Sequence, residues 1–147
     1  MSLKLDSNAR CAVVGYGSWA TAIVKILCEN EARVGWHIAN PVVAEGILAD
    51  EHNPKYLSDA ELDTSKLDIS DDINKVVAEA DIIIMATPSA YLKKTLEPLT
   101  VSLDDKFIVS AIKGIVPDEY VTVAEYFNQH YSIPFGRIGI VTGPCHA

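Results

Sequence analysis

The amino-acid sequence predicts an α/β protein built on a doubly wound, mostly parallel sheet with helices on both faces. Two observations lead to this fold class. Short apolar runs alternate along the chain with segments whose apolar residues recur at the helical period, and a glycine-rich turn joins the first run to the first helical segment. Since right-handed crossovers join parallel strands, the carboxyl ends of the strands share one edge of the sheet, where ligands bind in such folds.

The first strand and helix are expected within residues 10–27. Cys11–Val14 is an apolar run without a polar break, as a strand buried on both faces requires. From Trp19 to Leu27 the apolar residues recur every three to four positions, which is the period of a helix packed by one face. Asn30 is expected to cap the end of this helix.

The turn between these two elements reads Gly-Tyr-Gly-Ser-Trp-Ala and matches the pattern G-x-G-x-x-A. Gly15 permits the tight turn, Gly17 lets a pyrophosphate approach the backbone, and Ala20 keeps the helix close to the sheet. The N–H groups of Ser18 and Trp19 then face an anion, with the helix dipole behind them. Because the motif follows a strand and opens a helix, it predicts dinucleotide binding. The alternative is a glycine turn that binds nothing, with a tryptophan of the core.

The remaining elements continue the alternation. Asn40 and Pro41 read as the N-cap and first residue of a helix, and Ser89 reads as the cap of another. Residues 51–66 are polar and lack clear periodicity, which is typical of a lid or a wandering connection. Further strands are predicted over 33–39, 67–69, 81–86, 107–111 and 138–141, and further helices over 42–50, from 70–72 to 80, from 89 to 99 and from about 117 to 127.

The composition excludes some partners. The net charge is −8, from 20 acidic and 12 basic residues, which argues against a nucleic-acid partner because phosphate neutralisation needs clustered Lys and Arg. An anionic ligand must therefore be held by local donors. No apolar run approaches the ~18 residues that span a bilayer, and the first nine residues lack the apolar core of a signal peptide. We expect a cytoplasmic protein without membrane insertion.

Length and cysteine content add further expectations. Three cysteines, an odd number without metal-ligand spacing, fit free thiols in a reducing compartment, and no metal site is expected. Cys11 and Cys28 lie on apolar faces and are expected in the core. The length of 147 residues fits one domain. We expect residues 10–147 to form a dinucleotide-binding domain and residues 1–9 to be a disordered or tag-like lead.

Five motifs, in a consistent order, give a resemblance to a known family. They are Gly15-Tyr-Gly-Ser-Trp-Ala-Thr-Ala22, Asn53-Pro-Lys-Tyr-Leu57, Ala80-Asp81 through Pro88-Ser89, Lys113-Gly114 and Gly143-Pro-x-x-Ala147. With them the sequence resembles the amino-terminal half of a soluble, NAD(P)-dependent glycerol-3-phosphate dehydrogenase. The resemblance implies a Rossmann-like fold and hydride transfer between NAD(P)H and dihydroxyacetone phosphate or glycerol 3-phosphate, in the supply of glycerophospholipid precursors.

The family also has a carboxyl-terminal helical domain, which is not among these 147 residues. The resemblance implies that the general acid/base lysine lies there, so no catalytic residue is expected in this chain. We expect the chain alone to bind NAD or NADP without reducing the substrate, a small phosphorylated molecule. A homodimer is one possibility for the full-length protein.

The ends of the strands supply further cofactor contacts. Asn40 follows the second strand, where a side chain can bond the ribose, although N-capping explains it equally well. The family's usual arginine is Ala39 here, which leaves the choice between NAD and NADP open, and His37 reads as a packed histidine. Pro88 and Ser89 are expected to line the cofactor through their backbone.

Other residues are expected on the substrate side. Lys113 directly follows a strand, where a lysine suits a phosphate or an alkoxide, and the resemblance makes it a contact of substrate and cofactor. The resemblance also implies that Gly143 and Cys145 line the substrate and that Ala147 touches the cofactor. A thiol donates a weaker hydrogen bond than the serine hydroxyl more usual in the family. Tyr56 either folds over the nucleotide, as the resemblance implies, or covers the core.

Several alternatives accompany this interpretation. A nucleophilic pair of Cys145 with the following histidine is disfavoured, because adjacent residues of an extended chain point to opposite sides. A related dehydrogenase acting on another hydroxyacid or ketoacid would share this domain. A non-catalytic module that senses dinucleotide would keep the glycine turn without needing Lys113, and a methyl-donor site on a similar turn would bind S-adenosylmethionine instead.

Overall fold

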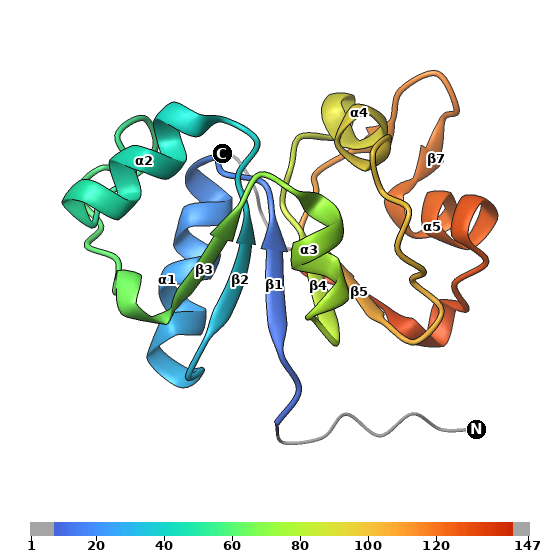
Figure 1. Cartoon of the computed structure of the whole chain (residues 1–147). Helices are drawn as coiled ribbons and strands as arrows, with labels where there is room; N and C mark the ends of the chain where they lie inside the picture. The colour runs from blue at the N-terminus through green and yellow to red at the C-terminus, as the bar shows by residue number, and fades with distance from the viewer. Residues whose placement is uncertain (1–7, 143–147) are drawn as a thin grey trace.

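A computed structural model describes residues 8–142 and shows a six-stranded sheet in which every pair of neighbouring strands is parallel. The strands of this sheet are β1 (Cys11–Val14), β2 (Val34–His37), β3 (Leu67–Ser70), β4 (Ile82–Met85), β5 (Phe107–Ser110) and β8 (Ile138–Ile140). Their order is β3-β2-β1-β4-β5-β8, so the chain winds outward from β1 and then returns to β4 on its other side (Figure 1). The predicted doubly wound parallel sheet is confirmed.

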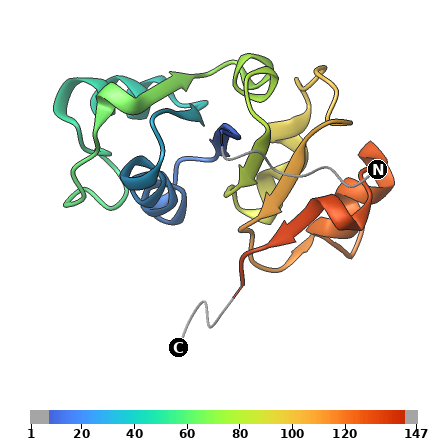
Figure 2. The same cartoon turned by 90° about the horizontal axis from the view of Figure 1, so that it is seen from below.

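Helices cover both faces of this sheet. The α-helices are α1 (Ser18–Asn30), α2 (Pro41–Asp50), α3 (Ile73–Ala78), α4 (Leu92–Leu96) and α5 (Val123–Tyr131). In Figure 1, α1 lies behind the sheet and α3 in front of it, and Figure 2 shows the two on opposite sides from below. Short 3-10 turns at η1 (Thr64–Lys66), η2 (Ser89–Tyr91) and η3 (Phe135–Arg137) and a hairpin of β6 (Ile115–Val116) and β7 (Val121–Thr122) complete the described chain.

The two faces of the sheet bury two separate apolar clusters. Because successive side chains of a strand point to opposite faces, Val13 packs with α1 and α2, whereas Ala12 and Val14 pack with α3, α4 and α5. All three of these side chains are fully buried. This explains why β1 reads as a continuous apolar run rather than an alternating one.

The segment before α5 differs from the prediction. The helix expected from about 117 to 127 begins only at Val123, after the β6–β7 hairpin. Asp118 and Tyr120 in the hairpin loop have positive φ values of 68° and 55°, a conformation that an α-helix does not contain. Thr122 caps α5 by accepting a hydrogen bond from a backbone N–H of the first turn.

Two expected caps are also wrong. Ser89 does not cap a helix, since it begins η2 and no side-chain hydrogen bond caps that turn. Asn30 is the last residue of α1 rather than its cap, a position taken by Glu31. The Asn30 amide instead donates to the carbonyl of Ile26, with 3.2 Å between nitrogen and oxygen. Both errors concern helix ends, where several side-chain arrangements suit the same residue types.

The packed face of α1 is also displaced from the predicted stripe. Trp19 and Ile26 are 50% and 57% exposed, although both were expected on the buried side. The buried residues of this helix are Ala20, Thr21, Val24 and Cys28. Trp19 is therefore a surface residue at the start of the helix, and the alternative of a core tryptophan is wrong.

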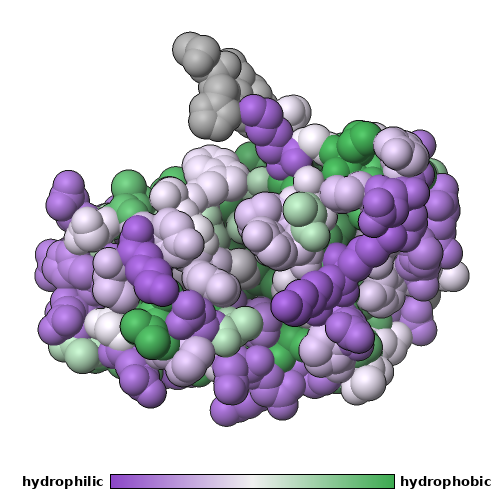
Figure 3. All heavy atoms as spheres, turned by 90° about the horizontal axis from the view of Figure 1, so that it is seen from above, coloured by the Kyte–Doolittle hydropathy of each residue, from purple (hydrophilic) through white to green (hydrophobic). Residues whose placement is uncertain are grey.

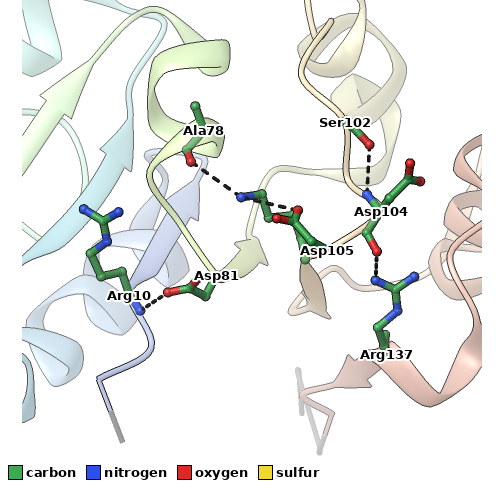
Figure 4. Close-up of polar contacts among 8 residues, drawn as sticks. Arg10, Ala78, Asp81, Ser102, Asp104, Asp105 and Arg137 are labelled. Carbon is green, nitrogen blue, oxygen red and sulfur yellow. Dashed lines mark hydrogen bonds and ion pairs between the residues drawn. The ribbon is translucent and has the colours of Figure 1, made fainter. Parts of the chain in front are cut away.

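Polar contacts hold the amino edge of the sheet together (Figure 4). The Asp81 carboxylate accepts a hydrogen bond from the backbone N–H of Arg10, at 2.8 Å. Lys106 is buried, with its Nζ 3.5 Å from the Ala78 carbonyl oxygen and 3.5 Å from a carboxylate oxygen of Asp105. Each of these two sets of contacts pairs polar groups near the starts of β1, β4 and β5, so their role at this edge is structural.

Two further expectations concern membranes and thiols. No helix within residues 8–142 is both long and apolar enough to cross a membrane. Cys11 and Cys28 are buried free thiols, as predicted, and burial raises the pKa of both. The lead expected over residues 1–9 lies almost entirely outside the described residues.

Candidate functional site

The carboxyl edge of the sheet changes its winding direction between β1 and β4. These strands are neighbours, yet the connections after them lead to opposite halves of the sheet. Ligands of open α/β sheets bind in the crevice at such a point. Seen from above in Figure 3, this edge presents pale, weakly polar residues near its middle and strongly hydrophilic residues toward both sides. The glycine turn after β1 and the segment after β4 meet here.

Gly15 occupies a conformation and a space that suit glycine alone. Its φ is 121°, a region that residues with a side chain rarely adopt. A Cβ at this position would lie 2.5 Å from the carbonyl oxygen of Ala86 and 2.9 Å from the backbone nitrogen of Thr87. The turn after β1 is therefore packed directly against the end of β4.

Gly17 has the opposite surroundings. Its backbone is extended, with φ −76° and ψ −173°, which any residue can adopt. Apart from its two chain neighbours, no heavy atom of the described residues would lie within 4 Å of a Cβ built on Gly17. Nothing among residues 8–142 therefore requires glycine here, and within this part of the chain the backbone is open on the side where a side chain would stand. This open backbone fits the close approach of a diphosphate, which is the role of the second glycine in the motif.

The amino terminus of α1 begins directly after Gly17. Ser18 and Trp19 are its first two residues, and both are exposed. The first N–H groups of an α-helix have no partner within the helix, and no acidic side chain occupies the first turn of α1. The positive end of a 13-residue helix therefore faces the open side of Gly17. This combination favours an anion.

Trp36 of β2 supports the turn, whereas the ring of the neighbouring His37 contacts the segment after β3. The indole N–H of Trp36, a fully buried side chain, donates to the carbonyl of Gly15 at 2.6 Å. His37 is buried as predicted, and its Nε2 lies 3.1 Å from the Asp71 carbonyl oxygen. Desolvation lowers the pKa of His37, so the ring is neutral and donates its Nε2 proton to that carbonyl. The contact of Trp36 was not predicted, although a buried indole N–H usually finds a partner.

The segment after α2 is anchored beneath the glycine turn. It folds back on itself through an antiparallel bridge between His52 and Glu61. Asn53 within it is fully buried. Its amide donates to the Tyr16 carbonyl at 3.1 Å, and the ring of Tyr16 lies 6.4 Å from that of Tyr56 between centroids. Tyr56 is 39% exposed beside the turn.

The sequence analysis quoted Asn53 only as part of a motif and assigned it no role. An Asn-Pro pair favours the start of a turn, and that was the signal available. The sequence gives no indication that this side chain reaches a turn more than 30 residues earlier. The hydrogen bond with Tyr16 is visible only in the folded chain.

The residues after β2 form a helix cap, unlike the glycine turn after β1. The Asn40 side chain accepts a hydrogen bond from the Val42 N–H at 3.0 Å and caps α2, whose first residue is Pro41. The capping interpretation of Asn40 is therefore confirmed, and its Nδ2 donor is left for other contacts. Ala39 is exposed between His37 and this cap. No arginine stands among the residues that join β2 to α2.

The other predicted contacts lie further along the same edge. Pro88 follows β4, is exposed and precedes the η2 turn that Ser89 begins. Lys113 follows β5 and is exposed. The structure therefore brings the ends of β1, β4 and β5 into neighbouring positions along one edge. Gly143, Cys145 and Ala147 lie outside the described residues.

A hollow lies away from this edge. It has a volume of about 380 Å³ and lies beside α3, between residues near the starts of β1, β2 and β3. Its charged lining includes Arg10, Lys75 and Glu79, together with the ion pair of Arg33 with Asp68. It does not include the glycine turn. Among residues 8–142, no cluster of three or more His, Cys, Asp or Glu side chains is arranged to hold a metal ion.

Comparison with known proteins identifies the family to which this chain is similar. Residues 10–147 match the model of the family described as NAD-dependent glycerol-3-phosphate dehydrogenase N-terminus. The glycerol-3-phosphate dehydrogenase [NAD(P)+] of Pseudomonas aeruginosa is 35% identical over 133 residues, and that of Pseudomonas paraeruginosa is 34% identical over 133 residues. Each alignment covers 90% of this chain and 38% of the relative. The chain therefore spans little more than a third of the length of these relatives.

Solved structures show the same fold. The glycerol-3-phosphate dehydrogenase of Plasmodium falciparum superposes with a TM-score of 0.79 at 22% identity, covering 94% of this chain and 41% of that chain. The enzyme of Saccharomyces cerevisiae gives a TM-score of 0.79 at 22% identity, covering 95% of this chain and 43% of that chain. At this level of identity the likeness concerns the fold.

Proposed function

This chain belongs to the NAD-dependent glycerol-3-phosphate dehydrogenase family, in its N-terminal domain, and from that premise we propose that it binds the diphosphate of a nicotinamide dinucleotide at the glycine turn after β1. The family uses NAD(P). In the whole protein, this domain would serve hydride transfer between NAD(P)H and dihydroxyacetone phosphate or glycerol 3-phosphate. That reaction would supply precursors of glycerophospholipids in the cytoplasm.

The open backbone at Gly17 is the observation that carries this proposal. Gly15 is explained by its φ and by its contact with Ala86, but Gly17 has neither constraint. No steric or conformational constraint among the described residues requires glycine at this position, which directly precedes a helix with exposed N–H groups. A ligand that approaches the main chain would account for the glycine. A turn that binds nothing would tolerate a side chain there.

Backbone donors would hold the cofactor in this arrangement. The N–H groups of Gly17, Ser18 and Trp19 would face the diphosphate, and Pro88 would line the cofactor from the end of β4. Tyr56 would lie over the nucleotide, consistent with its partial exposure beside Tyr16. The cofactor itself supplies the hydride chemistry, and these residues orient it and shield it from water.

Two further side chains would complete the cofactor and substrate contacts. Asn40 would offer its free Nδ2 to the ribose near α2, because its oxygen is used by the cap. Lys113 would contact both cofactor and substrate from the end of β5, where its exposed ammonium suits a phosphate. Gly143 and Cys145 would line the substrate and Ala147 would touch the cofactor.

The remaining parts of the activity are assigned to the rest of the full-length protein. The chain spans 38% of its curated relatives, and we propose that the general acid/base lies in the portion beyond this domain. The substrate would be a small phosphorylated molecule, with a homodimer as the proposed assembly.

Titration of this chain with NADH tests the proposal. Trp19 stands at the start of α1 and Trp36 contacts the carbonyl of Gly15, so tryptophan emission should change saturably as NADH is added, and Trp19→Phe should remove part of that change. The same chain should show no reduction of dihydroxyacetone phosphate. Absence of binding by both fluorescence and calorimetry would contradict the cofactor site, and measurable turnover would contradict the assignment of the acid/base to another domain.

A further inference from the structure

The buried side chain of Asn53 uses its whole hydrogen-bonding capacity at the glycine turn. Its Nδ2 donates to the Tyr16 carbonyl at 3.1 Å and to the Thr21 hydroxyl at 2.9 Å. Its Oδ1 accepts from the backbone N–H groups of Lys55 and Tyr56, at 3.0 Å and 3.1 Å. An amide offers two donors and an oxygen with two lone pairs, so every position is filled. The exposed fraction of the residue is 0%.

Thr21 continues this chain of contacts to the next peptide. Its hydroxyl, which accepts from Asn53, donates to the Gly17 carbonyl at 2.9 Å, and its backbone N–H donates to the same oxygen at 2.9 Å. The carbonyls of Tyr16 and Gly17 are thus both fixed from the protein side. Thr21 is fully buried as well.

Fixing a carbonyl also fixes the N–H of the same peptide. In a planar trans peptide the C=O and the N–H point in opposite directions, and the described chain contains no cis peptide. With the Tyr16 carbonyl turned toward Asn53, the N–H of Gly17 points away from it. With the Gly17 carbonyl turned along α1 toward Thr21, the N–H of Ser18 points out of the end of the helix.

We propose that Asn53 is a positioning residue for the dinucleotide, acting with Thr21 to aim the N–H groups of Gly17 and Ser18 at the diphosphate. This inference rests on the proposed function. The same side chain ties the segment that carries Tyr56 to the turn, so it couples the two parts of the site. Its effect on the ligand passes through the backbone, since it has no free polar group of its own.

Asn53→Asp tests the donor and acceptor groups of the side chain separately. The aspartate retains the acceptor for Lys55 and Tyr56 but loses both donors, so the Tyr16 carbonyl loses its partner. We expect affinity for NADH to fall about tenfold. Inorganic pyrophosphate, used as a competitor, should weaken in parallel because it contacts only the backbone donors.

Asn74 provides a matched control at a distance from the turn. Its amide donates to the Pro98 carbonyl at 2.8 Å, and its oxygen accepts from the N–H groups of Thr100 and Val101 at 2.7 Å and 3.0 Å. Asn74→Asp therefore removes the same kind of donor from another loop. It should lower the urea midpoint of unfolding while NADH affinity stays within about twofold of the wild type.

Thr21 supplies an uncharged second test. Thr21→Val removes the hydroxyl and should weaken NADH binding in the same direction as Asn53→Asp, whereas Thr21→Ser, which keeps the hydroxyl, should restore it. If Asn53→Asp does not fold, this pair decides the question. Unchanged NADH affinity in Asn53→Asp and in Thr21→Val would overturn the inference. Absence of NADH binding by the wild-type chain would instead overturn the proposed function.

Discussion

At the scale of single residues, the two glycines of the turn have different physical reasons. Gly15 is required by the protein, because its φ of 121° and its contact with the Ala86 carbonyl leave no room for a side chain. Gly17 is required by nothing within the described protein. The same residue type, two positions apart, therefore serves stability in one case and, in the proposed function, ligand access in the other.

We predict opposite consequences for alanine at these two positions. Gly15→Ala should lower the free energy of unfolding by roughly 2–4 kcal/mol, because it combines backbone strain with a steric conflict at β4. Gly17→Ala should cost at most about 1 kcal/mol, the loss of a favourable N-cap residue, but should weaken NADH binding by about tenfold or more. Urea unfolding and NADH titration of both variants measure the two effects. Equal stability losses would contradict the assignment.

At the scale of elements, Asn40 at the junction of β2 and α2 has a structural role, to which the proposed function adds a contact with the ribose. The Asn40 oxygen caps α2 by accepting from Val42, while the other side of its amide remains a donor toward the ribose proposed to lie nearby. An acidic residue here bonds the ribose 2′-hydroxyl in NAD-dependent proteins, whereas an arginine accepts a 2′-phosphate. The amide of Asn40 does neither strongly.

Two substitutions at Asn40 should separate capping from cofactor choice. Asn40→Ala should lower the free energy of unfolding by about 1 kcal/mol through loss of the cap. Asn40→Asp should keep the cap, since aspartate caps as well as asparagine, and should weaken NADPH relative to NADH by roughly tenfold through repulsion of the 2′-phosphate. Urea unfolding and paired titrations measure both. An alanine variant as stable as the wild type would refute the capping role.

At the scale of the whole molecule, acid stability depends on several groups whose pKa values are lowered in the folded chain. Desolvation lowers the pKa of His37 below its usual 6.5. The Arg33 guanidinium lowers the pKa of Asp68, and Lys93 with His130 lowers the pKa of Glu119. In each case the unfolded chain binds protons at a higher pH than the folded chain, so acid favours unfolding.

Stability should therefore fall in two stages as the pH is lowered. Below pH 6.5 the unfolded chain protonates His37 while the folded chain keeps it neutral, so stability is lost as the pH falls through the lowered pKa. The carboxylates add a second loss at lower pH. His37→Gln should flatten the decline between about pH 7 and about pH 5, because its amide donates without titrating. Urea midpoints across this range test it, and an unchanged slope would exclude His37 as the cause.

Much of the fold was predictable because it depends on local patterns. The apolar run Cys11–Val14 and the strand around Ile82–Met85 identify themselves by composition, and Asn40-Pro41 by capping chemistry. The start of α5 was not predictable, because nothing in the sequence of residues 117–122 distinguishes a first helical turn from a hairpin. Its positive φ values depend on packing around the hairpin, and single-sequence patterns do not report packing.

The candidate site was likewise predictable in part from the sequence. The sequence by itself determined the sheet, the glycine turn and its place at the start of α1, since these follow from apolar periodicity and from the conformations open to glycine. Only the tertiary structure decided that Trp36 and Asn53 support that turn and that Trp19 faces solvent. The reason is physical: a hydrogen bond between segments more than 20 residues apart depends on how the chain folds back on itself, and no local pattern encodes that distance.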